Sequence, residues 1–121
     1  MVELGDLREG VFSSDLMAFV RKTLALSHIQ LIGIGCILAF YRGVKPTSRN
    51  MGMLFKVVNI VQSELGIRLT VVSGDNSANY EWANSGQALG EINNLRIGES
   101  ILLGCETIGR QAILGLHTNT F

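Results

Sequence analysis

Two short polar segments have residue types that could bind an anion. Residues 73–77 (Ser-Gly-Asp-Asn-Ser) offer small residues, a hydroxyl and an amide where an apolar run stops. Arg96 is followed by Gly98 at the opening of a short apolar segment, Glu99–Leu103. Free backbone N–H groups and the dipole at the start of a helix favour bound phosphate. Either segment alone is ordinary turn chemistry, so the phosphate hypothesis requires that the two lie together.

The spacing of apolar residues predicts the elements that position these segments. Short segments rich in apolar residues predict strands at residues 2–4, 29–35, 67–72 and 95–97, and 29–35 is almost wholly apolar, as a strand buried on both faces would be. Helices are predicted between and after them, over residues 16–25, 51–65, 78–85 and 99–103. Gly66 is suited to end the second helix, because glycine readily adopts a left-handed conformation.

The predicted order of elements is therefore β-α-β-α-β-α-β-α, which favours an α/β protein with parallel strands. Four β-α units are half of a (β/α)₈ TIM barrel, which typically needs ~250 residues. An open doubly wound sheet would produce the same order, so periodicity leaves the two architectures open. In both, ligands bind at the carboxyl ends of the strands, where the two polar segments fall. No linker composition divides residues 1–121, so we expect a single domain.

The overall composition argues against several classes of function. Ten acidic residues balance ten basic ones, so no basic field for nucleic acid is expected. Cys36 and Cys105 have no spacing typical of a zinc site or a disulfide framework, and no metal site is predicted. No apolar run reaches the ~18 residues of a membrane span. The first residues do not resemble a signal peptide, and these absences predict a cytoplasmic protein without a membrane partner.

Four motifs, in order along nearly the whole chain, resemble one family. They are Gly-Asp-Leu-Arg-Glu-Gly at 5–10, Gly-Ile-Gly at 33–35, Ser-Gly-x-Asn-Ser at 73–77 and Asn-Asn-Leu-Arg-Ile-Gly-Glu at 93–99. Together they resemble the alanine/ornithine racemase-like enzymes that use pyridoxal 5′-phosphate (PLP), and most closely the single-barrel ornithine racemase branch. That family's fold is a PLP-binding (β/α)₈ barrel. The resemblance implies that this chain is a partial domain, the C-terminal half of that barrel with roughly its fifth to eighth strands.

The resemblance also implies which residues hold the phosphate of the cofactor. Ser77 and the backbone at Ile97, Gly98 and Glu99 would bind it, and Asn76 would brace the loop. No metal is implied.

Two arginines would contact the rest of the cofactor, again by resemblance. Arg96 would face the pyridine nitrogen. Because an arginine does not give up its proton, that nitrogen stays unprotonated and the ring is a weaker electron sink. Arg8 would lie near the phenolic oxygen.

The sequence also departs from the family pattern, and we assign no catalytic residue to it. The family's Schiff-base lysine lies on the first strand of the barrel, which has no counterpart here; Lys22, Lys45 and Lys56 are not at predicted strand ends. Ile37 replaces a polar residue of the relatives. Asp75 stands where glycine is common, which would put a carboxylate beside the phosphate unless its side chain points away.

These observations predict part of a PLP-dependent amino-acid racemase that acts on its amino-acid substrate only with an N-terminal half supplied elsewhere. Met1 falls in mid-sequence relative to the family, so we expect a fragment or a truncated frame. The alternative is a non-catalytic PLP- or phosphate-binding fragment, or a degenerate remnant that self-associates. Half a barrel leaves open sheet edges, whose unpaired backbone groups invite pairing, and a homo-oligomer is therefore expected.

Overall fold

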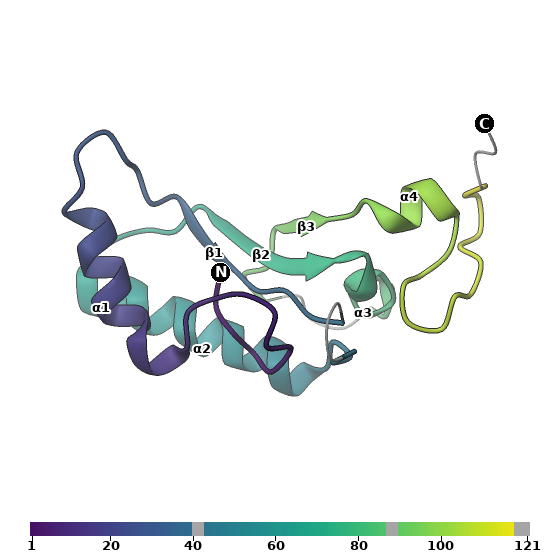
Figure 1. The fold of residues 1–121 in the computed structure, drawn as a ribbon, viewed down its shortest axis with the longest axis horizontal. Helices are drawn as coiled ribbons and strands as arrows, with labels where there is room; N and C mark the ends of the chain where they lie inside the picture. Colours follow the sequence, from purple (N-terminus) through teal and green to yellow (C-terminus); the bar gives the residue numbers. More distant parts are fainter. Residues whose placement is uncertain (40–42, 87–89, 118–121) are drawn as a thin grey trace.

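The computed structural model describes residues 1–39, 43–86 and 90–117. Helices and strands alternate in Figure 1, in the order α1 (Ser13–Leu24), β1 (Gly33–Gly35), α2 (Ser48–Leu65), β2 (Val71–Asn76), the 3₁₀ turn η1 (Ser77–Asn79), α3 (Tyr80–Asn84), β3 (Asn94–Arg96) and α4 (Glu99–Leu103). Helix α2 lies beneath the sheet and α1 packs against α2 at the left of the view, and the strands run toward the end that carries α3 and α4. None of the described helices is long and apolar enough to cross a membrane.

The three strands form one parallel sheet in the order β1-β2-β3. Gly33 pairs with Val71, and Asn76 at the end of β2 pairs with Arg96 at the end of β3. The α/β class with parallel strands is thus confirmed, whereas the four predicted β-α units are not, because three strands form within the described residues. All three carboxyl ends point to the same end of the molecule (Figure 1).

The first predicted strand, residues 2–4, is reduced to a pair of bridges. Val2 bridges both Val11 and Cys36, and its N–H donates to the Gly35 carbonyl at 2.7 Å. The chain then folds back at once, since Gly5 has a φ of 116°. The segment therefore borders the sheet beside β1 without forming a strand of its own.

Several other boundaries differ from the sequence prediction. The strands predicted at residues 29–35 and 67–72 begin four residues later, at Gly33 and Val71. The segment 73–77, predicted as a loop, instead extends β2 to Asn76, because the Cys36 N–H donates to the Ser73 carbonyl at 3.1 Å. Helix α2 begins three residues early because Thr47 and Asn50 form a reciprocal capping box. It ends at Gly66, which has a φ of 61° as predicted, and α4 has its predicted bounds.

The spacing between β1 and β2 depends on glycine. A Cβ at Gly33 would lie 2.1 Å from the Val71 carbonyl oxygen, and one at Gly35 would lie 2.8 Å from the Ser73 Cβ. The same Cβ at Gly35 would be 3.2 Å from the Arg96 Nη1. The Gly-Ile-Gly motif thus lets the strands approach and leaves room for an arginine side chain above them.

The core lies between this sheet and α2. One face of α2 is fully buried at a spacing of three and four residues, by Met51, Leu54, Val58 and Val61. These side chains belong to one apolar cluster with residues of the sheet such as Val72. The packing fixes the sheet from below, so that its strand ends can position polar side chains.

Candidate anion site

The carboxyl ends of the strands border one open cavity of about 280 Å³. Six of the seven site residues predicted from the sequence line it, and Ile97 is the exception. The complete lining is Arg8, Ile37, Asn76, Ser77, Arg96, Gly98 and Glu99. The segments after β2 and β3 therefore lie together, as the phosphate hypothesis requires.

Arg96, the last residue of β3, lines this cavity and links β2 to the residue that follows β1. Its Nη1 donates to the Ser73 Oγ at 2.9 Å, and its Nη2 donates to the Cys36 carbonyl at 2.6 Å. Nη1 also lies 3.5 Å from the Met1 Sδ. These contacts use three of the five N–H groups of the guanidinium, which is held in place yet exposed on the cavity side.

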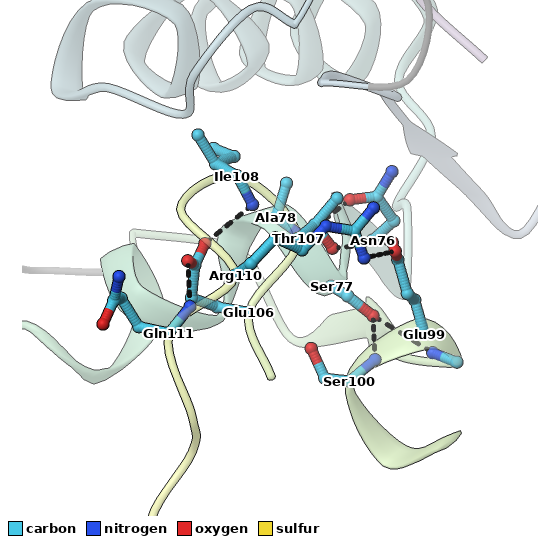
Figure 2. Close-up of polar contacts among 11 residues, drawn as sticks. Asn76, Ser77, Ala78, Glu99, Ser100, Glu106, Thr107, Ile108, Arg110 and Gln111 are labelled. Carbon is cyan, nitrogen blue, oxygen red and sulfur yellow. Dashed lines mark hydrogen bonds and ion pairs between the residues drawn. The ribbon is translucent and has the colours of Figure 1, made fainter. Parts of the chain in front are cut away.

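Ser77 joins the segment after β2 to the start of α4. Its Oγ accepts hydrogen bonds from the Gly98 N–H at 3.3 Å and the Ser100 N–H at 3.1 Å (Figure 2). A serine hydroxyl has two acceptor positions and one donor. With both acceptor positions used inside the protein, the hydroxyl hydrogen is what Ser77 can offer to an anion.

Asn76 braces the ends of β1 and β2 against one another. Its Oδ1 accepts from the Ala78 N–H at 2.8 Å, and its Nδ2 donates to the Leu38 carbonyl at 3.1 Å. Arg8 approaches the cavity from the loop that follows Val2. The Glu3 carboxylate shapes that loop by accepting the Leu7 N–H at 3.0 Å.

This geometry can be compared with known proteins. The family described as "Alanine racemase, N-terminal domain" matches the chain over residues 1–105. The chain belongs to this family. It is 38% identical over its whole length to an ornithine racemase of Acetoanaerobium sticklandii, of which it covers 35%. It is 31% identical to a lysine racemase of Thermotoga maritima, of which it covers 33%. The chain thus spans about a third of the length of both relatives, and no solved structure matches it.

In this alanine racemase family chain, the Asp75 side chain points away from the cavity. It is fully buried and its Oδ1 accepts the Leu38 N–H at 2.9 Å, while Oδ2 has no partner within the described residues. Burial raises the pKa of Asp75 to about 6; hydrogen bonds from Leu38 and Asn76 and the charge of Arg96 oppose the rise, and Asp6 adds to it. Its φ of 106° lies in the left-handed region that favours glycine.

Cys36 is a structural thiol. It is fully buried at the end of β1, and burial, together with the nearby Asp75, raises its pKa to about 12. A thiol with that pKa stays protonated at neutral pH and is a poor nucleophile. Among residues 1–39, 43–86 and 90–117, no three His, Cys, Asp or Glu side chains could hold a metal ion together.

Sequence reasoning missed the partners of Glu99. The Glu99 carboxylate accepts from the Thr107 Oγ1 at 3.0 Å and from the Arg110 Nη1 (Figure 2). This contact with Glu99 raises the pKa of Arg110. Both partners lie in an irregular segment after α4, where no periodicity or motif points back to Glu99.

Proposed function

We propose that this chain forms the part of a PLP-dependent amino-acid racemase that holds the phosphate and the pyridine nitrogen of the cofactor. The observation that carries the proposal is one cavity shared by Ser77, Arg96 and Arg8, which come from η1, the end of β3 and the loop after Val2. Membership of the alanine racemase family supports it independently.

The residues of the cavity fit the cofactor. The volume of about 280 Å³ lies just below the ~300–1,000 Å³ typical of ligand pockets, which suits a small molecule. Arg8 and Arg96 both line the cavity and supply positive charge, and the Ser77 hydroxyl supplies a donor. Charge-assisted hydrogen bonds of this kind are the strong ones for phosphate.

Arg96 is suited to donate a hydrogen bond to the pyridine nitrogen. PLP, when bound, supplies an electron sink that stabilises negative charge on the substrate carbon. Arg96 keeps its proton at any physiological pH, so it donates a hydrogen bond without protonating the nitrogen. Its bonds to Ser73 and Cys36 hold the guanidinium in one orientation, which favours a defined contact.

The names of the two relatives refer to ornithine and lysine. We therefore place the substrate among amino acids with a side-chain amine, bound together with an N-terminal half that supplies the cofactor-binding lysine. A second candidate is a non-catalytic PLP- or phosphate-binding fragment that self-associates. It is favoured by β3, an edge strand of the described sheet, and by the exposed Ile101 and Leu102 of α4. Translating the DNA upstream separates the two, because the racemase requires a strand that ends in a lysine.

The proposed site predicts that binding depends on a phosphate group. Pyridoxine 5′-phosphate has no aldehyde and cannot bond covalently to a lysine, so calorimetry with it measures the non-covalent site alone. We expect it to bind at least about tenfold more tightly than pyridoxine, because a hydrogen bond to a charged group contributes ~1.5–3 kcal/mol. Ser77→Ala should weaken the binding of pyridoxine 5′-phosphate by about 10- to 100-fold.

Ser63→Ala is the matched control, since Ser63 is exposed on α2 and its hydroxyl donates to the Ile60 carbonyl of the same helix. It should bind like the wild type. Equal affinity for the two compounds, or a Ser77→Ala variant indistinguishable from Ser63→Ala, would refute the proposed site.

A further inference from the structure

Residues 104–113, here called the Glu106 loop, fold around a buried carboxylate. Backbone pairs close the loop, from the Glu106 N–H to the Gln111 carbonyl and from the Ile113 N–H to the Gly104 carbonyl, both at 2.9 Å. The Glu106 side chain is 4% exposed, and it accepts the Ile108 N–H at 2.7 Å and the Gln111 N–H at 2.9 Å. The Glu106 carboxylate therefore provides hydrogen-bond acceptors for backbone N–H groups inside the loop.

The shape of this loop is specified at two further positions. A Cβ at Gly109 would lie 2.7 Å from the Glu106 Oε1, so a larger residue there would displace the carboxylate. Arg110 adopts a left-handed φ of 57°. Burial raises the pKa of Glu106, but hydrogen bonds from backbone N–H groups outweigh that and lower the pKa overall, so the carboxylate stays charged near neutral pH. The loop thus presents its outer side chains in a defined arrangement.

Two of these side chains contact the carboxylate of Glu99, the first residue of α4. Thr107 donates to Oε2 of Glu99 at 3.0 Å, and Arg110 pairs with Oε1 (Figure 2). Both oxygens of a carboxylate that lines the proposed phosphate cavity are therefore engaged from the side of the Glu106 loop. Without these partners, a full negative charge would stand at the rim of a site for an anion.

We propose that Arg110 and Thr107 are positioning residues of the anion site, which neutralise the Glu99 carboxylate and hold it against the Glu106 loop. The inference rests on the proposed function, and it goes beyond the family match, which ends at residue 105. An exposed ion pair contributes little to folding stability, and the Arg110 side chain is 59% exposed. We therefore expect the contact between Arg110 and Glu99 to act mainly by reducing the negative charge next to a bound phosphate.

Calorimetry with pyridoxine 5′-phosphate and with pyridoxine at low salt tests the proposal. Arg110→Gln should weaken binding of the phosphate compound about three- to tenfold, as expected for one uncompensated charge nearby, and leave pyridoxine unchanged. Thr107→Val should act in the same direction by about two- to threefold, since one hydrogen bond is lost. Arg21→Gln, an equal charge change on the distant helix α1, is the control.

The double variant Glu99→Gln/Arg110→Gln decides between charge compensation and a structural role. It should regain wild-type affinity, because the carboxylate that needed a partner is gone. A double variant as weak as Arg110→Gln, or an Arg110→Gln variant that matches Arg21→Gln, would overturn the proposal. A wild type that does not prefer the phosphate compound would instead refute the proposed function, and this inference with it.

Discussion

Gly33→Ala is expected to lower the free energy of unfolding by more than about 3 kcal/mol and to leave little folded protein. Overpacking a core costs ~1–3 kcal/mol when flexible side chains can adjust. Here the added Cβ would lie 2.1 Å from the Val71 carbonyl oxygen and 2.7 Å from its Cβ, so the backbones themselves must separate. That separation breaks the pairing of β1 with β2. Urea unfolding followed by circular dichroism measures the loss.

Gly52→Ala is the matched control for this change. Gly52 lies within α2, and a Cβ there would meet no atom within 4 Å. Replacing a glycine inside a helix with alanine should raise stability by about 0.5–1 kcal/mol. A Gly33→Ala variant within about 1 kcal/mol of the wild type would contradict the close parallel pairing of β1 and β2.

Asp75→Asn is expected to stabilise the chain at pH 7 and to remove a loss of stability between about pH 4 and pH 6. The ordinary pKa of 3.8 is raised to about 6 in the folded chain by burial. Below pH 4 the carboxyl is protonated in both states, so burial carries no charge penalty. As the pH rises from about 4 to 6, the unfolded state releases this proton while the folded state still holds it. The free energy of unfolding therefore falls by up to about 3 kcal/mol.

An asparagine at this position keeps an oxygen for the Leu38 N–H and tolerates a positive φ better than most residues. Its NH₂ would stand where the Asp75 Oδ2 has no partner, which offsets part of the gain and leaves about 1–2 kcal/mol at pH 7. Asp15→Asn, on an exposed position in the first turn of α1, should show no such gain. Parallel pH profiles for Asp75→Asn and the wild type would contradict a buried, perturbed carboxyl.

Local signals explain what could be predicted from the sequence. Helix α4 and the end of α2 at Gly66 depend on nearby residues, and both have their predicted bounds. The meeting of Ser77 with Gly98 follows from parallel strands, whose carboxyl ends share an edge, and so it was predictable once the alternation was seen.

Other features depend on contacts between residues far apart in the chain, which local patterns do not report. The segment 2–4 pairs with Val11 and Cys36 and so fails to form a strand of its own. Segment 73–77 looks like a turn, yet β2 continues to Asn76 because its neighbours pair with it. The direction of the Asp75 side chain is set by the Leu38 N–H, and that of Glu99 by Arg110.

The central claim, that the strand-end cavity binds the phosphate of PLP, is tested most directly by nuclear magnetic resonance of the backbone amides. Pyridoxine 5′-phosphate should shift the amide signals of Ser77, Gly98 and Glu99 most strongly, and pyridoxine should shift them far less. Gly52 and Gly66, on the distant helix α2 and at its end, should not move. Shifts concentrated at the separate cavity beside Trp82, or no phosphate-dependent shift at Ser77 and Gly98, would contradict the account.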